Sequence, residues 1–149
     1  MPRIRIVPPV YLGASLGAMG VLHEYWPIMI LFATPWRWLG LIPLISGILL
    51  GGWAAWLFRK NGTTIRPGQI SSRLMMEGPF RYSRNPIYVG MVLLLAGAAI
   101  LLGSLSPWVM LPIFVGVIAR NIIPVEESML KEAFGTEYQQ YQASTRRWI

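Results

Sequence analysis

Four apolar runs, separated by charged or turn-forming residues, constrain this chain more than any other feature. They cover residues 8–25, 39–58, 86–103 and 107–123. A helix needs about 20 mostly apolar residues to cross a bilayer. Only 13% of the residues are charged, against about 25% in soluble domains. The pattern predicts an all-α integral membrane protein with about four transmembrane helices in a single domain, 1–149.

The remaining residues form a polar loop, 59–85, and a C-terminal segment, 125–149, which Pro124 is expected to separate from the fourth run. With both termini on one side of the membrane, every lysine and arginine except Arg37 falls on that side. Cytoplasmic segments carry an excess of these residues, so we predict a cytoplasmic loop and termini. In the C-terminal segment, apolar and aromatic residues recur at helical spacing, which predicts an amphipathic helix: Leu130, Phe134, Tyr138 and Tyr141. Gly135 is predicted to cap a helix end within this segment.

Composition excludes several function classes. The chain has no cysteine, which rules out disulfides, thiolate metal ligands and a cysteine nucleophile. His23 is the single histidine, so we expect no zinc site and no serine triad. The net charge of +7 could indicate nucleic acid, but the charges flank apolar runs. Membrane topology explains them better, and we expect the lipid bilayer as partner and no nucleic acid.

The stretch from Gly78 to Gly90 joins the polar loop to the third run. Pro86 suits the first turn of a helix, because its missing N–H would have no intrahelical partner there. Asn85 precedes it and is suited to cap the helix with its side-chain oxygen. A helix start with Arg84 beside it attracts anionic groups. We therefore predict a cofactor site at this position.

Two adjacent carboxylates, Glu126 and Glu127, follow the fourth run. The third and fourth runs form a predicted helical hairpin, which places this doublet near the start of the third run. Carboxylates at a membrane boundary are costly unless they are paired or bound to a ligand. They either pair with arginines such as Arg84 or hold a ligand, and the composition leaves both alternatives open.

The chain resembles the isoprenylcysteine carboxyl methyltransferase family, whose outline the phospholipid N-methyltransferases share. Two motifs in order carry the resemblance: G-P-F-R-Y-S-R-N-P-I-Y-V-G from Gly78, and E-E-S-M-L-K-E-A-F-G-T-E-Y-Q-Q-Y from Glu126. It covers about Gly62 to the end, together with the hydropathy of the first two runs. The resemblance implies a short bacterial member in the inner membrane that binds S-adenosylmethionine at the cytoplasmic surface.

The resemblance also implies which residues contact the cofactor. Asn85 replaces the histidine of the family, which keeps a polar side chain but loses titration near neutral pH. Ile122 stands where the eukaryotic enzymes use an arginine, so the arginine contact to a prenylcysteine substrate is not carried over. By motif position, the cofactor residues are Ser72, Arg73, Leu74, Met75, Gly78, Phe80, Asn85, Pro86, Ile87, Tyr88 and Glu126.

The expected activity is methyl transfer to a lipid-like or membrane-partitioned acceptor. Arg84 and Glu127 are our candidate catalytic residues: the first can bind a carboxylate at the helix start, and the second can assist as a base. No histidine lies on the cytoplasmic side, which favours an acceptor that needs no deprotonation, such as a carboxylate. Two alternatives are N-methylation of a phospholipid amine and a non-catalytic protein that binds anionic lipid or a partner through its basic loop.

Overall fold

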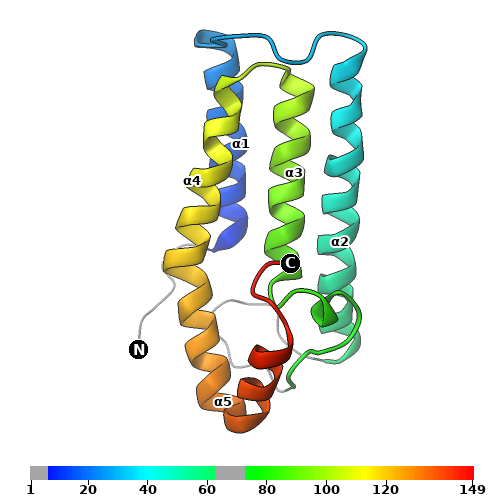
Figure 1. Cartoon of the computed structure of the whole chain (residues 1–149), viewed down its shortest axis with the longest axis vertical. Coiled ribbons are helices and arrows are strands. Elements are labelled where there is room, and N and C mark those ends of the chain that lie inside the picture. The colour runs from blue at the N-terminus through cyan, green and yellow to red at the C-terminus, as the bar shows by residue number, and fades with distance from the viewer. Residues whose placement is uncertain (1–6, 63–72) are drawn as a thin grey trace.

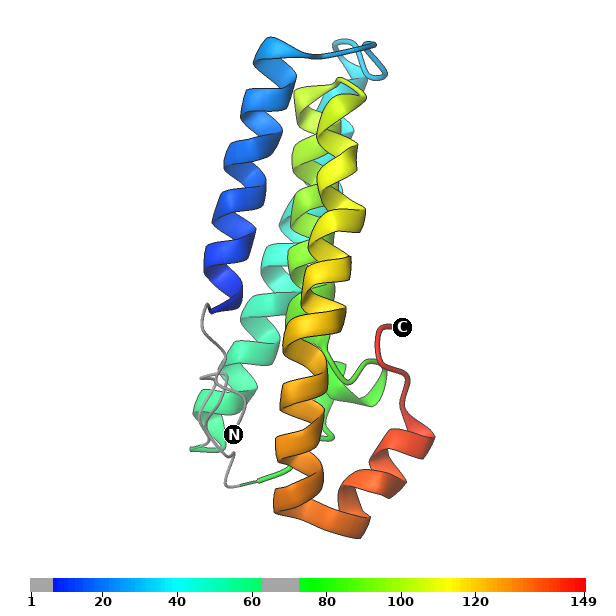
Figure 2. The same cartoon turned by 90° about the vertical axis from the view of Figure 1, so that its left-hand side faces the viewer.

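The computed structural model describes residues 7–62 and 73–149. Within these residues the chain is helical and forms no strand, so the all-α prediction is confirmed. The long helices run side by side along one axis (Figures 1 and 2). The elements are α1 (Pro8–Tyr25), η1 (Trp36–Gly40), α2 (Leu41–Lys60), η2 (Gly78–Arg81), α3 (Pro86–Leu102), η3 (Ser106–Val109), α4 (Met110–Val117), η4 (Ile118–Ile122) and α5 (Ile123–Ser144).

Within residues 7–62 and 73–149, two stretches are long and apolar enough to cross a membrane. They are Trp36–Lys60, which joins η1 to α2, and Ser106–Ser144, which joins η3 to α5. Helix α3 is also apolar but has 17 residues. Helices α1, α2 and α3 lie within a few residues of the first three predicted apolar runs, whereas four membrane crossings stay a prediction.

The predicted interruption at Pro124 is wrong, because the helix continues through it. The π-helical turn η4 ends two residues earlier, and the N–H of Ile123 bonds to the Ile118 carbonyl, five residues back. In an α-helix a proline ring collides with the carbonyl four residues before it. The extra residue of a π turn relieves this collision. The predicted fourth run and the first half of the C-terminal segment are therefore one helix.

Gly135 reverses the direction of α5. Its φ of 50° and ψ of −120° break the helix, and glycine tolerates the positive φ because it has no Cβ. The residues after the kink run back toward the bundle, and the chain ends beside the start of α3 (Figures 1 and 2). The buried rings of Tyr138 and Tyr141 pack with Leu74. This return places the C-terminus at the predicted site.

Helices α2 and α3 approach each other closely at paired glycines. A Cβ at Gly90 would lie 2.7 Å from the Gly47 carbonyl oxygen, and a Cβ at Gly97 would lie 2.6 Å from the Gly40 carbonyl oxygen. Small residues allow such backbone contact between helices. Two close contacts along the same face fix α3 against α2, and with it the start of α3.

Candidate functional site

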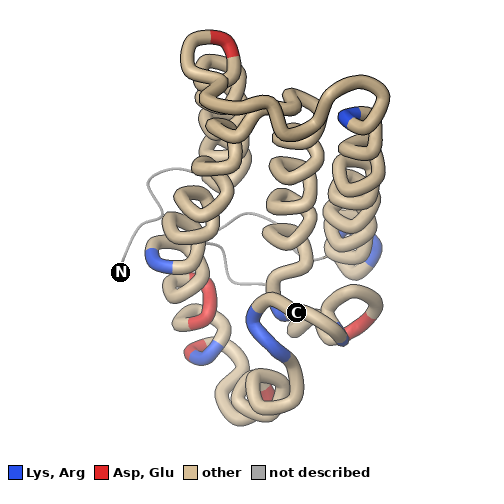
Figure 3. Tube along the Cα trace, turned by 45° about the horizontal axis from the view of Figure 1, so that its top comes forward, with Lys and Arg blue, Asp and Glu red and all other residues tan. Residues whose placement is uncertain are grey.

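Charged residues gather at the end of the bundle where α3 begins (Figure 3). Three segments meet there: residues 83–88 around the start of α3, the first turn of α5, and residues 145–149, which we call the C-terminal strap. The backbone N–H of Arg84 donates to the Arg146 carbonyl at 2.9 Å. The predicted meeting of the Asn85 stretch with the acidic doublet is present in the structure.

Glu126 is joined to α3 by Tyr88. The Tyr88 hydroxyl donates to Glu126 Oε1 at 2.8 Å. Pro86 begins α3, which places Tyr88 in the first turn, and Glu126 lies in the first turn of α5. Tyr88 is buried, with 6% of its surface exposed, so this hydrogen bond is shielded from water. One carboxylate of the doublet is thus held by a neutral donor.

Glu127 is instead held by two arginines. Its carboxylate lies 3.4 Å from Arg84 Nη2. Arg147 donates to both of its oxygens, from Nη2 at 2.7 Å and from Nε at 3.1 Å. The Glu127 and Arg84 side chains are only 10% and 9% exposed. Their opposite charges therefore neutralise each other where water screens the attraction only weakly. The sequence alternative in which the doublet pairs with arginine holds for Glu127.

The guanidinium of Arg84 has hydrogen-bond donors that the described part of the chain does not use. Its Nε and Nη1 are buried without a hydrogen-bond partner among the described residues. Burial raises the pKa of the nearby Tyr138 hydroxyl, while the charge of Arg84 and a side-chain hydrogen bond between the two residues act in the opposite direction. A buried donor without a partner is costly. A planar guanidinium with donors to spare is suited to a carboxylate or another anionic group.

Asn85 occupies the N-cap position of α3, as predicted, but its side chain does not cap the helix. Its backbone carbonyl accepts the N–H groups of Tyr88 and Val89 at 3.0 and 3.1 Å. Its Nδ2 donates to the Arg147 carbonyl at 2.8 Å. The prediction of a side-chain cap is wrong: the amide nitrogen is bound to the strap, and the side-chain oxygen accepts no N–H of the helix.

The apolar residues predicted to contact the cofactor pack into the protein interior. Phe80 and Met75 join the α2 residues Ala54 and Leu57 in a buried cluster, and Phe80 meets Phe58 edge to face with ring centroids 5.3 Å apart. Leu74 packs with the tyrosines after the kink. These three residues therefore position the loop in the structure, and their contact with a cofactor stays a prediction.

Tyr141 ties this loop to the end of α5. Its hydroxyl donates to the Phe80 carbonyl at 2.6 Å. Burial raises the pKa of Tyr141, so the hydroxyl keeps the proton that it donates. The segment after the Gly135 kink is therefore bonded to the loop that leads into α3.

The other predicted residues lie around the same helix start. Gly78 has a φ of +57°, Pro86 is buried, and Ile87 packs against the cluster of Phe80. Arg73 is exposed and pairs with Glu77 at 3.3 Å. Ser72 lies outside the described residues.

Comparison with known families decides what kind of protein this arrangement belongs to. A model of the family described as phospholipid methyltransferase matches residues 35–137. The chain belongs to this family. The match contains both the start of α3 and the acidic doublet. Searches of curated proteins and of solved structures each found no match.

Membership of the phospholipid methyltransferase family confirms the resemblance seen in the sequence. It supports methyltransferase activity and, together with the two apolar helices, association with a membrane. Methyltransferases of this kind generally use S-adenosylmethionine. The residues at the start of α3 fit its amino-acid portion, because the unpartnered donors of Arg84 suit a carboxylate and Glu126 suits an ammonium group.

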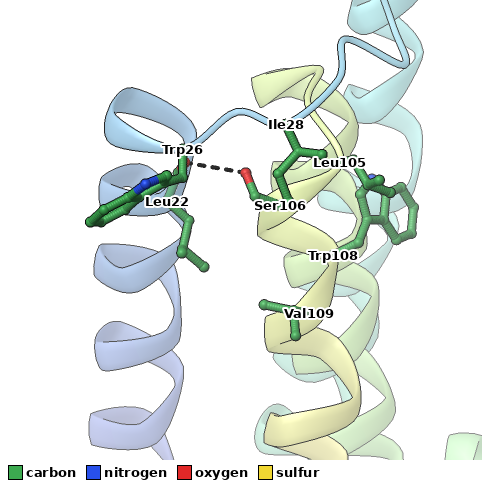
Figure 4. Close-up of a pocket in the computed structure, with 7 residues that line it drawn as sticks. All are labelled: Leu22, Trp26, Ile28, Leu105, Ser106, Trp108 and Val109. Carbon is green, nitrogen blue, oxygen red and sulfur yellow. Dashed lines mark hydrogen bonds between the residues drawn. The ribbon is translucent and has the colours of Figure 1, made fainter.

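An apolar cavity lies at the end of the bundle opposite the start of α3 (Figure 4). The cavity, of about 480 Å³, is lined by Leu22, Trp26, Ile28, Leu105, Ser106, Trp108 and Val109. The Ser106 hydroxyl donates to the Leu22 carbonyl at 3.2 Å, and none of the lining residues is charged. This cavity does not fit a zwitterionic, cationic cofactor. No group of metal-ligating side chains occurs among the described residues.

Sequence reasoning missed Arg147 and Tyr141 as parts of the site. Both reach it through contacts distant in sequence: 20 residues separate Arg147 from Glu127, and 61 separate Tyr141 from Phe80. Tyr141 was recognised as part of an amphipathic pattern, and Gly135 as a helix end. Neither signal predicts the direction in which the chain returns.

Proposed function

We propose that this protein transfers a methyl group from S-adenosylmethionine to a lipid-like or membrane-partitioned acceptor at the cytoplasmic face of a bacterial inner membrane. In this proposal the whole chain, 1–149, is one domain with four membrane spans. The loop, the C-terminal segment and both termini are cytoplasmic. One observation carries the proposal: in a methyltransferase family member, the start of α3 meets a carboxylate pair at the charged end of the bundle.

The cofactor would be held by residues of opposite charge. Glu126 would bind the ammonium group, while the spare donors of Arg84 and the first turn of α3 would bind the carboxylate. The exposed ring of Tyr82 offers a face for the adenine or for the positive charge. When bound, S-adenosylmethionine supplies a methyl group on a cationic sulfur that is open to in-line displacement.

The chain itself contributes positioning. Methyl transfer depends on holding the reacting atoms in line and on excluding water. Tyr88 fixes Glu126 from α3, and two arginines fix Glu127. These contacts hold both carboxylates before any ligand arrives, so little reorganisation is needed on binding.

A carboxylate is the favoured acceptor. Both glutamates of the doublet already accept hydrogen bonds from Tyr88 or from arginine, and the single histidine lies at the far end of α1. An acceptor that arrives already deprotonated therefore suits the site. Arg84, which orients the carboxylate of the methyl donor in this proposal, and Glu127, as a candidate base, remain our catalytic candidates.

A phospholipid amine is the second candidate acceptor. The matched family is described as phospholipid methyltransferase, which favours a lipid head group with a nitrogen nucleophile. Such an amine must arrive neutral or lose a proton, and Glu127 is the nearby residue that could accept one. The two acceptors differ in the chemical stability of the product, because a methyl ester is cleaved by mild base and a methylamine is not.

The test is incubation of the purified protein with methyl-labelled S-adenosylmethionine and a membrane lipid extract. We expect label in a lipid product. Release of the label as methanol by mild base identifies a methyl ester, whereas a methylamine keeps the label on nitrogen. Glu126→Ala should abolish both labelling and cofactor binding, whereas Glu132→Ala, an exposed site on the same helix, should not. Absence of cofactor binding at millimolar concentration in the folded wild-type protein would favour the non-catalytic alternative, in which the basic loop binds anionic lipid.

A further inference from the structure

The C-terminal strap contacts both halves of the site. The Arg147 carbonyl accepts hydrogen bonds from Asn85 Nδ2 at 2.8 Å and from the Ser83 hydroxyl at 3.4 Å. From the same residue, the guanidinium donates to both oxygens of Glu127. Arg147 thus joins the start of α3 to the acidic doublet through its backbone on one side and its side chain on the other.

Trp148 anchors the strap to the core of the helix bundle. This side chain is partly buried and packs against the core cluster that contains Tyr88 and Ile122. The N–H of Thr145 also bonds to the Tyr141 carbonyl at 2.9 Å. These anchors on either side of Arg147 limit the positions that its guanidinium can take.

The bidentate pair with Arg147 affects what Arg84 can do. Both oxygens of Glu127 are engaged by Arg147, while Arg84 approaches the carboxylate through Nη2 alone. The remaining nitrogens of Arg84, Nε and Nη1, have no hydrogen-bond partner among the described residues. Without Arg147, Arg84 would be the nearest charged partner for both oxygens of Glu127. A bidentate pair between Arg84 and Glu127 would then use the donors of Arg84 that are now free for a ligand.

We propose that Arg147 is a positioning residue that keeps Arg84 available to the carboxylate of the methyl donor. Its guanidinium saturates Glu127, and its carbonyl holds Asn85 beside the helix start. The inference rests on the proposed function and deepens it, because it assigns to the strap the recognition of the amino-acid end of the cofactor. Arg147 acts through Arg84 and Glu127 and is not itself a catalytic residue.

The test compares Arg147→Ala and Arg147→Lys with the matched control Arg146→Ala. Arg146 is exposed, and its contact with the site uses the backbone carbonyl, which alanine retains. Binding is measured for S-adenosylmethionine and for 5′-methylthioadenosine, which lacks the amino-acid carboxylate. We expect Arg147→Ala to weaken S-adenosylmethionine binding by about tenfold or more and to leave methylthioadenosine binding unchanged. Lysine should restore only part of the loss, because it cannot form the fork.

A second measurement uses the protein without ligand. Hydrogen exchange of the Arg84 amide, which donates to the strap, should be faster in Arg147→Ala and unchanged in Arg146→Ala. In a Glu127→Gln background the effect of Arg147→Ala on cofactor binding should shrink, because the two residues act as a unit.

The outcomes separate this inference from the proposed function. Equal weakening of both ligands in Arg147→Ala, or equal behaviour of the two alanine variants, would overturn the role of Arg147 while wild-type methyl transfer stands. Failure of the folded wild-type protein to bind S-adenosylmethionine would overturn both.

Discussion

The Tyr88 hydroxyl lies 2.8 Å from a carboxylate oxygen of Glu126 and bridges the first turns of α3 and α5. This contact joins two segments that lie 38 residues apart in the chain. It also fixes the half-buried carboxylate that we propose as the partner of the cofactor's ammonium group, so its removal has a specific consequence.

Tyr88→Phe should weaken cofactor binding while the fold is kept. A hydrogen bond to a charged group contributes about 1.5–3 kcal/mol. Because this bond already exists without ligand, that energy is an upper bound, and the dissociation constant should rise by at most roughly a hundredfold. Titration calorimetry with S-adenosylmethionine measures the change. Tyr82→Phe is the matched control, because Tyr82 is 75% exposed. Equal affinities for Tyr88→Phe and the wild type would mean that Glu126 needs no partner to bind the ligand.

Glu127→Ala should destabilise the protein. The change removes the carboxylate that compensates Arg84, whose side chain is 9% exposed. Breaking a buried ion pair by removing one partner costs about 3–5 kcal/mol. Denaturation in detergent micelles, followed by circular dichroism, measures the loss. Glu132→Ala should leave stability nearly unchanged, and a similarly small effect in Glu127→Ala would contradict the assigned burial of this pair.

Alanine substitution should have opposite effects on stability at two glycines, because only one of them lies where α2 and α3 approach closely. Gly90→Ala would place a Cβ 2.7 Å from the Gly47 carbonyl oxygen, and overpacking of this kind costs about 1–3 kcal/mol. Gly116→Ala has nothing within 4 Å of the new Cβ, so removing a helical glycine should stabilise α4 by about 0.5–1 kcal/mol. The melting temperatures of the two variants should move in opposite directions. A shift of the same sign in both would argue against this helix contact.

The sequence predicted the helix positions and the meeting of the two motifs for identifiable reasons. Pro8 and Pro86 mark the starts of α1 and α3, and charged or turn-forming residues separate the apolar runs. A helical hairpin places the residues that precede its first helix beside those that follow its second. This simple geometry is enough to bring Asn85 near Glu126.

Other features depend on contacts that no local pattern encodes. Pro124 normally breaks a helix, but a π turn just before it removes the collision. Asn85 is a residue type that favours helix caps, yet its amide nitrogen donates to the Arg147 carbonyl and its side chain does not cap α3. The sequence also marked Gly135 as a helix end without indicating the direction of the return. The C-terminal strap therefore could not be predicted as part of the site.

The two ends of the bundle provide the sharpest test of where the chemistry occurs. His23 Nδ1 lies 2.7 Å from the Ser104 hydroxyl, just beyond the C-terminal end of α3, whereas Tyr88 lies in its first turn. The 17 residues of α3 span about 25 Å at roughly 1.5 Å per residue, too far for one small cofactor to touch both.

We therefore expect His23→Ala to retain most of the methyl transfer, and Arg84→Ala and Glu126→Ala to abolish it. Transfer of label to lipid by equal amounts of folded protein measures the three activities, and Ser104→Ala serves as a second variant at the far end. Loss of the hydrogen bond to Ser104 can loosen α1, so each variant is compared at a temperature well below its own melting point. Complete inactivity of a folded His23→Ala protein would place the reaction at the end of the bundle that holds the apolar cavity, because no contact at the charged end involves that residue among those described.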